Sequence, residues 1–278
     1  MPSELKNKFE NYLIVNRFAL KTQKAYLGCI KDLARYHRQS PDRLSNDQVQ
    51  DYLVHLIKQR GLSWSSCNVA FCALTCFYHK FLDRKLTEIK IPRRPRQKKL
   101  PEIFSRAEVG LLIENAKDLR SSTLLMMVYG SGLRVSEVVR LQHHHIESER
   151  MMLRVEQSKA RKDRYTLLSK KALEQLRFYY KIHRPGTYLF SGRIKDEPLP
   201  IASAQHMYDY AKDKAGLNKG RGIHTLRHCF ATHLLMQGVD IQLIKEFLGH
   251  KSIETTLVYL HMMPERVSKI KSPLDADE

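Results

Sequence analysis

The chain has 278 residues, of which 42% are hydrophobic, and a formal net charge of +19 at pH 7. This length corresponds to one or two domains of about 100–200 residues each. No apolar run approaches the roughly 18 residues of a membrane span, and the N-terminus lacks the apolar centre of a signal peptide, so we expect a cytoplasmic protein with no membrane partner. The basic excess indicates a polyanionic partner, most often nucleic acid, although charge alone does not separate DNA from RNA.

In the N-terminal 89 residues, the pattern predicts four short helices. Apolar residues recur at helical spacing in residues 3–18, and Thr22 is expected to cap a second helix. Ser45 and Gln48 have the spacing of a capping box at the start of a third helix, and Ser63 begins a fourth. Helices with such short connections indicate a small bundle, in which the aromatic residues belong to the core rather than to a base-stacking surface.

A basic, proline-rich stretch separates this bundle from the rest of the chain. Residues 90–101, KIPRRPRQKKLP, hold three prolines and six Lys/Arg. Prolines stop helices and stiffen linkers, and a basic linker can lie along phosphates. We therefore expect an N-terminal domain over 1–89, a linker over 90–101, and a second domain over 102–278 that opens with a capping box at Ser105 and Glu108.

A glycine-containing turn in the second domain predicts an anion site. Gly130 and Gly132 allow a tight turn that sets Arg134 at the start of the next helix, which is expected to run to about Leu141. A guanidinium at a helix N-terminus is a favourable place for an anion. Glu137, three residues further on, could orient the guanidinium.

A short β-hairpin is predicted next. Residues 151–157 and 164–168 have the composition of strands, and the polar segment SKARKD joins them. Lys159 lies in that turn, where its flexible side chain can reach a phosphate, and Lys162 is an alternative for the same role. Further helices follow, one of them over 170–183, so the second domain is expected to be mainly helical with a small β-sheet.

Neither the cysteines nor the histidines have the spacing of a metal site. The five cysteines are an odd number without a disulfide framework, and Cys72 and Cys76 have no third ligand nearby. We expect reduced, mostly buried thiols. The triplet His143 to His145 resembles a metal cluster, but adjacent positions rarely converge on one ion. We expect it at the surface or facing DNA, and no metal is predicted.

The last fifth of the chain gathers groups suited to phosphodiester chemistry. His224 and Arg227 are three residues apart and share a helix face. Gly249 is predicted to end a helix, with His250 directly after it and Tyr259 nine residues further on. Attack on a phosphodiester needs a nucleophile, proton carriers and a cationic clamp. The phenol, the two imidazoles and the guanidinium provide all three.

These residues resemble the tyrosine recombinases, also called the phage-integrase family. The family signature runs Arg, Lys, His-x-x-Arg, His or Trp, and Tyr, and it is matched in order by GSGLRVSEVVRL, SKARKDR, HTLRH, FLGHKS and TTLVY. The resemblance is close over about residues 100–265 and loose before them. The catalytic residues that it implies are Arg134, Lys159, His224, Arg227, His250 and Tyr259.

The resemblance implies a fold and a reaction. The fold would be mainly α with a small β-sheet (α+β), with a SAM-like N-terminal helical domain that binds DNA and a tyrosine-recombinase catalytic domain. The reaction would be site-specific cleavage and rejoining of DNA through a 3′-phosphotyrosyl intermediate, for integration, excision or resolution, without cofactor or metal. A homotetramer would act on paired sites in double-stranded DNA. The target site and any accessory proteins stay open.

The resemblance also implies a role for each group. Tyr259 would attack phosphorus while the two arginines clamp the phosphate oxygens. His224 would assist the proton transfer from the phenol, and Lys159 would protonate the leaving 5′ oxygen. His250 would donate a hydrogen bond to the phosphate.

Other functions fit parts of the same sequence. Residues 229–248, with Gly238 in a turn, could form a helix-turn-helix of a non-catalytic DNA-binding or regulatory protein. The second helix, IQLIKEFL, offers few donors to a DNA groove, and Glu246 would face a polyanion. We therefore expect that helix to be buried and to set His250 in place. A type IB topoisomerase and a recombinase-like protein without catalysis are further alternatives, disfavoured by the short chain and the intact signature.

Overall fold

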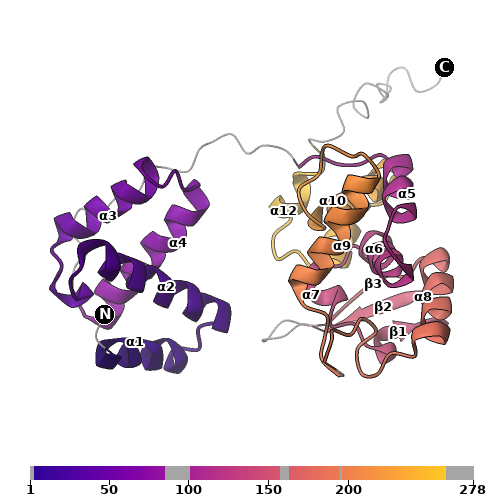
Figure 1. Ribbon diagram of the computed structural model, residues 1–278. Coiled ribbons are helices and arrows are strands. Elements are labelled where there is room, and N and C mark those ends of the chain that lie inside the picture. Colours follow the sequence, from indigo (N-terminus) through magenta and orange to yellow (C-terminus); the bar gives the residue numbers. More distant parts are fainter. Residues whose placement is uncertain (1–2, 85–100, 157–162, 195, 261–278) are drawn as a thin grey trace, which may run out of the picture. The chain divides into compact units, whose positions relative to one another are not determined.

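The computed structural model describes residues 3–84, 101–156, 163–194 and 196–260 (Figure 1). The chain folds as two compact units, Met1–Lys98 and Lys99–Glu278. Within the described ranges, no helix combines the length and the apolar character needed to cross a bilayer. Of the predicted linker over 90–101, the described part is Pro101.

The described part of the N-terminal unit is a helical bundle. Its α-helices are α1 (Ser3–Val15), α2 (Leu20–His37), α3 (Asn46–Lys58) and α4 (Trp64–Thr75), with a 3-10 turn at Pro41–Arg43 and a π-helical turn at Cys76–Phe81. The capping box of Ser45 and Gln48 is confirmed, and Ser63 caps α4. The cap predicted at Thr22 is wrong, because α2 already begins at Leu20 and its N-cap, Ala19, makes no side-chain hydrogen bond.

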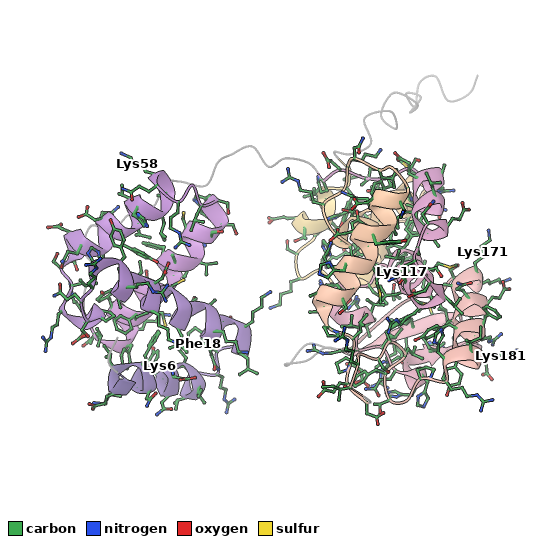
Figure 2. The ribbon with its side chains drawn as sticks, in the orientation of Figure 1. Lys6, Phe18, Lys58, Lys117, Lys171 and Lys181 are labelled. Atoms are coloured by element: carbon green, nitrogen blue, oxygen red, sulfur yellow. The ribbon has the colours of Figure 1, made fainter. Side chains whose placement is uncertain are left out.

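The core of this unit is apolar and aromatic. Phe9 and Phe77 are fully buried and meet edge to face, with ring centroids 5.0 Å apart. The buried hydroxyl of Tyr78 donates to the carbonyl of Pro41 at 2.6 Å, so burial of this ring leaves no polar atom unpaired. The prediction that such aromatic residues lie in the core is confirmed for Phe77 and Tyr78, whereas Lys58 points outward from α3 (Figure 2).

The C-terminal unit is mainly helical and has a small antiparallel sheet at one end (Figure 1). The helices are α5 (Arg106–Glu114), α6 (Leu119–Ser131), α7 (Val135–Val138), α8 (Lys170–His183), α9 (Ile201–Lys214), α10 (His224–Met236), α11 (Ile241–Leu248) and α12 (Glu254–Leu257). The strands are β1 (Ile146–Glu147), β2 (Met152–Val155) and β3 (Arg164–Leu167), in that order across the sheet. Helix α6 packs against α8, α9 and α10, and α11 packs against β3.

The predicted fold class, mainly helical with a small sheet, is confirmed, and two local predictions need correction. Helix α7 ends at Val138 instead of Leu141, because the amides of Arg140 and Leu141 bond three residues back and tighten the chain into a turn. The His143–His145 triplet is a 3-10 turn that buries the ring of His145 to 6% exposure, so this ring is not at the surface. The capping box of Ser105 and Glu108 is confirmed.

Candidate active site

A single glycine makes the turn that positions Arg134. Helix α6 ends at Ser131, and Gly132 follows with a φ of +62°, a left-handed conformation that favours glycine. A Cβ at Gly132 would collide with the ring of Phe230. Gly130 lies inside α6 and takes no part in the turn, which corrects the prediction that both glycines form it. Arg134 then becomes the N-cap of α7.

Two guanidiniums converge after this turn. Arg134 donates from Nη1 to Oε1 of Glu137 at 2.8 Å and keeps 29% of its side chain exposed. Arg227 of α10 is only 1% exposed, and its Nη1 donates to the carbonyl of Gly132 at 2.6 Å. Burial and the nearby charge of Arg134 lower the pKa of Arg227 to about 9, so the group still carries its charge at neutral pH. Among the described residues, its Nε is a buried nitrogen without a hydrogen-bond partner.

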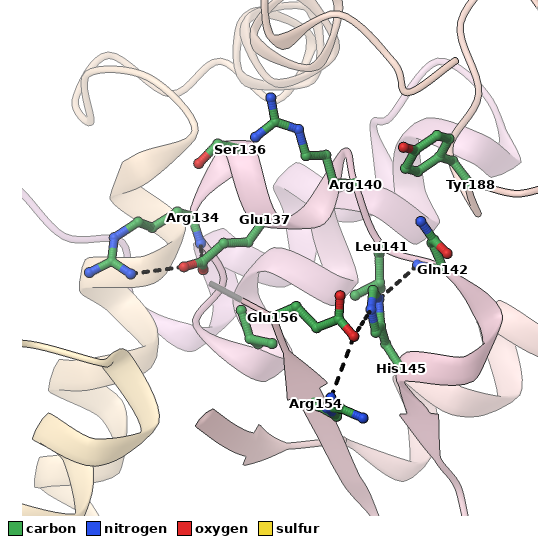
Figure 3. A pocket seen from close by; sticks show the side chains of 11 residues that line it. Arg134, Ser136, Glu137, Arg140, Leu141, Gln142, His145, Arg154, Glu156 and Tyr188 are labelled. Carbon is green, nitrogen blue, oxygen red and sulfur yellow. Dashed lines mark hydrogen bonds and ion pairs between the residues drawn. The ribbon is translucent and has the colours of Figure 1, made fainter. Parts of the chain in front are cut away.

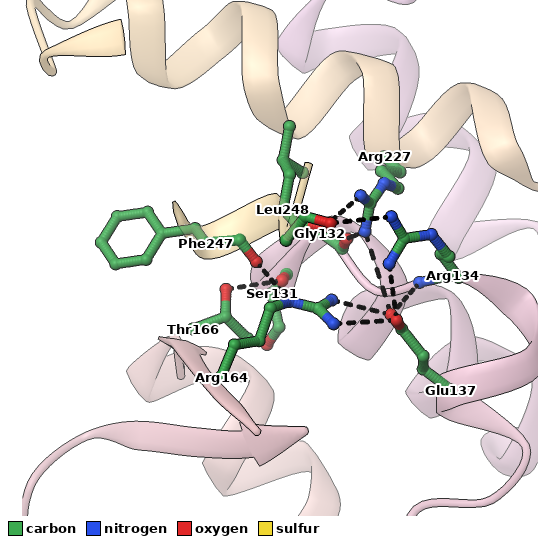
Figure 4. A network of polar contacts seen from close by, with 10 residues as sticks. Ser131, Gly132, Arg134, Glu137, Arg164, Thr166, Arg227, Phe247 and Leu248 are labelled. Carbon is green, nitrogen blue, oxygen red and sulfur yellow. Dashed lines mark hydrogen bonds and ion pairs between the residues drawn. The ribbon is translucent and has the colours of Figure 1, made fainter. Parts of the chain in front are cut away.

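One buried carboxylate links these cations (Figure 4). Glu137 is 12% exposed and accepts two 2.8 Å hydrogen bonds from Arg164, one on each oxygen, and its Oε2 lies 3.9 Å from Nη1 of Arg227. Burial alone would raise the pKa of Glu137, but the hydrogen bonds and charges of Arg164 and Arg134 lower it to about 2. One negative charge is thus shared by three guanidiniums, and the site keeps a net positive charge that suits an anion.

The same three guanidiniums are tied to the end of α11. Arg164 donates from Nε to the carbonyl of Phe247 at 2.8 Å, Arg227 from Nη2 to that of Leu248 at 2.5 Å, and Arg134 from Nη2 to that of Gly249 at 3.3 Å. These carbonyls lie at the C-terminus of a helix, where no intrahelical donor is left for them and the helix dipole is negative. Gly249 ends the helix with a φ of +60°, as predicted.

Tyr259 reaches this site from the segment after α12. The side chain is 3% exposed, and its hydroxyl lies 3.0 Å from Nδ1 of His228 in a hydrogen bond. Its ring stacks on that of His250, with centroids 6.5 Å apart and planes 15° apart. Burial raises the pKa of the Tyr259 phenol, whereas the charges of Arg227 and Arg134 oppose that rise.

Two further histidines complete the site. His224, at the N-terminus of α10, keeps an exposed side, and its pKa is lowered by partial burial of the ring and by the charges of Arg227 and Arg134. His250 has its Nδ1 3.0 Å from Oγ1 of the buried Thr256. Burial, followed by the same two charges, lowers the pKa of His250 to about 3. Both pKa shifts favour neutral imidazoles at neutral pH.

Comparison with known sequences identifies the relatives of this chain. The phage integrase family matches residues 96–266, and the N-terminal SAM-like domain of phage integrases matches residues 5–88. The chain belongs to the phage integrase family. A putative integrase/recombinase of Sinorhizobium fredii is 36% identical over 98% of this chain and 88% of its own length. The tyrosine recombinase XerA of Pyrococcus horikoshii is 33% identical over 92% and 88%.

A solved structure has the same fold as this family member. The crystal structure of a lambda integrase tetramer bound to a Holliday junction aligns with a TM-score of 0.73 over 91% of this chain and 76% of that one, at 19% identity. Because its relatives are named integrase and recombinase, the chain belongs to the enzymes called tyrosine recombinases. Nothing in these relationships favours the non-catalytic helix-turn-helix protein. The buried Ile244, Phe247 and Leu248 also place one face of α11 in the core.

Five of the six catalytic residues implied by the signature lie close together in this recombinase. Arg134 and Arg227 act electrostatically on all three of the other described groups, His224, His250 and Tyr259. The sixth, Lys159, and its alternative Lys162 lie in residues 157–162, outside the described residues.

Sequence reasoning missed two residues of this centre, Arg164 and His228. Arg164 opens β3 with its side chain inward, and its only sequence signal is the alternation with Tyr165, which points outward. His228 follows His224 by four positions and so shares its helix face, a spacing that was available from the sequence. Glu137 had been expected to orient Arg134, and its contacts agree with that role.

A cavity of about 410 Å³ lies next to this centre, with Arg134 and Glu137 at one end (Figure 3). At the other end lie His145 and Glu156, which together with His144 are close enough to share an ion. Nδ1 of His145 accepts the backbone N–H of Gln142 at 3.0 Å, which places the proton on Nε2 in the neutral ring. A protonated Nε2 offers no lone pair to a metal. This atom lies 3.6 Å from Oε1 of Glu156, which is too long for a hydrogen bond.

Proposed function

We propose that Tyr259 of this recombinase attacks a DNA phosphodiester held by Arg134 and Arg227. The Oη–P bond would form as the bond from phosphorus to the 5′ oxygen breaks, which leaves a 3′-phosphotyrosyl link and a free 5′ hydroxyl. A 5′ hydroxyl from a partner strand would reverse the step and rejoin the DNA. Because the phosphotyrosine keeps the bond energy, strand exchange would need no external energy source.

One observation carries this proposal: a buried guanidinium with an unpartnered Nε lies within electrostatic reach of the tyrosine hydroxyl. A buried donor without a partner costs roughly 1–3 kcal/mol. A phosphate oxygen that accepts from Nε of Arg227 would recover that cost and bring phosphorus toward Tyr259. The second guanidinium, on Arg134, is 29% exposed. It donates to Glu137 and Gly249 with one N–H each, so others of its five N–H groups would donate to the same phosphate.

The remaining groups support the transfer of protons and the binding of the phosphate. His224 keeps an exposed side next to both arginines and would assist the proton transfer from the phenol. His250 would donate a hydrogen bond to a phosphate oxygen. Lys159 would protonate the leaving 5′ oxygen, with Lys162 as the alternative for this role. None of these steps uses a cofactor or a metal.

We further propose double-stranded DNA as the partner and a homotetramer on paired recombination sites as the active assembly. The +19 charge and the likeness to a lambda integrase crystallised as a tetramer on a Holliday junction support this. Residues 1–89 would bind DNA as a SAM-like domain, 90–101 would link it along the phosphates, and 102–278 would be the catalytic domain. The cytoplasmic location and any accessory proteins stay predictions.

A nicked suicide duplex incubated with EDTA tests the reaction. The wild-type chain should become covalently attached to a 3′ phosphate, release a 5′ hydroxyl, and carry the adduct on Tyr259 in mass spectrometry. Tyr259→Phe removes the phenolic oxygen alone, so DNA binding should persist while cleavage falls to background. An adduct on a serine, a 5′ linkage, or a strict need for magnesium would overturn the proposal.

A further inference from the structure

The hydroxyl of Tyr259 is hydrogen-bonded to a histidine outside the signature. Nδ1 of His228 lies 3.0 Å from Oη, and the two rings have centroids 5.7 Å apart at 54°. Both groups are largely enclosed, since Tyr259 is 3% exposed and His228 is half-buried. A general base must lie within about 2.6–3.2 Å of the atom whose proton it removes, and His228 meets this condition.

Helix α10 explains how His228 comes to this position. His224, Arg227 and His228 are at i, i+3 and i+4, so they lie on one face of the helix. His224 stands at the exposed end and meets His228 edge to face, with ring centroids 4.8 Å apart. His224 is thus placed for the phosphate at the mouth of the site, and His228 for the phenol one turn deeper.

We propose that His228 is a further catalytic residue, whose Nδ1 holds the Tyr259 hydroxyl and accepts its proton when Oη attacks phosphorus. The proton of Oη moves to Nδ1 as the Oη–P bond forms, and the leaving 5′ oxygen takes a separate proton from its own acid. On rejoining, His228 returns the proton to Oη as the Oη–P bond breaks. This inference rests on the proposed function of Tyr259 as nucleophile.

The charges around His228 and Tyr259 are compatible with this proton transfer. Burial and then the charges of His224 and Arg227 lower the pKa of His228 to about 4, so the ring is neutral at pH 7 and has a lone pair to accept with. Among the described residues, the titratable and charged groups that act on it are His224, Arg227 and Tyr259. A bound phosphate brings negative charge beside Arg227 and so makes a protonated His228 easier to form during the attack.

His228→Asn separates holding the hydroxyl from accepting its proton. The asparagine oxygen takes the place of Nδ1 and can accept the hydrogen bond, but it cannot take the proton at neutral pH. In single-turnover cleavage of the suicide duplex at saturating protein, we expect the rate to fall by about 10²–10⁴-fold, the usual contribution of general acid–base catalysis. DNA affinity should not change.

A matched pair on the same helix provides the control. His233 of α10 has its Nδ1 2.8 Å from the hydroxyl of Tyr129, and the rings meet edge to face. His233→Asn therefore makes the same exchange in an equivalent tyrosine–histidine contact outside the proposed site, and cleavage should keep its wild-type rate. His228→Gln is a second neutral variant in case the asparagine protein does not fold, with DNA binding as the check on folding.

A more acidic nucleophile tests the proton transfer itself. Fluorinated tyrosine at position 259 ionises more readily, so it should restore cleavage in the His228→Asn protein far more than it changes the wild-type rate. A purely structural role for His228 predicts no such rescue. Wild-type cleavage by His228→Asn, or a slow variant that fluorotyrosine does not rescue, would overturn the inference. Absence of any Tyr259 adduct in the wild-type chain would instead overturn the proposed function.

Discussion

Each unit of this recombinase places a carboxylate between arginines, and the two clusters differ in how much water reaches them. In the N-terminal unit, Asp32 pairs with Arg60 at 2.5 Å and with Arg35 at 3.6 Å, and the three side chains are 35–81% exposed. In the C-terminal unit, Glu137 is 12% exposed, and its partner Arg164 is 7% exposed.

The difference in burial changes what the ion pairs do. An exposed pair is screened by water and contributes about 0–1 kcal/mol. A buried pair costs desolvation to form, but breaking it strands an uncompensated charge at a cost of about 3–5 kcal/mol. The cluster of Glu137 therefore fixes the positions of its guanidiniums, whereas the cluster of Asp32 can rearrange at little cost.

Replacement of the buried carboxylate should have the largest effect. Glu137→Gln keeps the shape but leaves the guanidinium of Arg164 without its counter-charge, so the C-terminal unit should lose about 3–5 kcal/mol of unfolding free energy. The single tryptophan, Trp64, lies in α4 of the other unit. In urea, far-UV circular dichroism should therefore report an earlier transition while the Trp64 fluorescence transition stays in place. A shift of the fluorescence transition alone would contradict this assignment.

Exchange of Arg227 for lysine should have an effect of nearly the same size, but on the cleavage rate and not on the unfolding free energy. Arg227→Lys keeps the charge but cannot donate to the carbonyls of Gly132 and Leu248 and also offer Nε to a phosphate. Single-turnover cleavage should fall by about 10²–10³-fold, as for the loss of one preorganised donor. Arg60→Lys makes the same exchange in the exposed cluster and should leave the rate unchanged. Equal losses in both variants would remove the distinction between the two clusters.

The contribution of the buried Glu137 cluster to stability should decrease in acid. The pKa of Glu137 is lowered from 4.5 to about 2 on folding, so its stabilisation is fully present above pH 4.5 and is lost as the pH falls toward 2. The shift corresponds to about 3 kcal/mol. The stability difference between wild type and Glu137→Gln, measured by urea denaturation, should therefore shrink between pH 4.5 and pH 3. A constant difference over this range would show that the carboxylate charge is not its source.

The exposed cluster should give the smallest effect. Asp32→Asn leaves Arg60 and Arg35 in contact with water, so the N-terminal unit should lose about 0–1 kcal/mol. The Trp64 fluorescence transition in urea measures this directly. A loss as large as that of Glu137→Gln would mean that burial does not separate the two clusters.

The sequence pointed to the signature residues of this site but not to all of the residues that hold them in position. Arg134, Arg227 and Tyr259 could be found because their order and local sequence resemble the family signature. Arg164 could not, because a four-residue strand shows which side chains share a face but not which face is buried. The short α7 was also missed, because the chain tightens into a turn after Val138 without a local stop signal, and Leu141 packs into the core at 3% exposure.

The cap predicted at Thr22 failed for a related reason. Helix α2 starts at Leu20 without any side-chain cap, so its first turn depends on packing within the bundle. By contrast, the capping boxes at Ser45 and Ser105 were predicted correctly, since both partners of each box lie within four residues of one another. Local hydrogen bonds can thus be predicted from the sequence, whereas boundaries set by distant contacts cannot.

The three carbonyls at the end of α11 have a consequence for mutational scanning. Because the acceptors are backbone atoms of Phe247, Leu248 and Gly249, no side-chain replacement deletes them. An alanine scan of α11 will register lost packing and overlook the anchoring of three guanidiniums. Only changes that displace the main chain reveal this anchoring. One such change is Gly249→Ala, which forces a side chain into a left-handed φ of +60°. Sequence tolerance along this helix is therefore a poor measure of its importance to the active site.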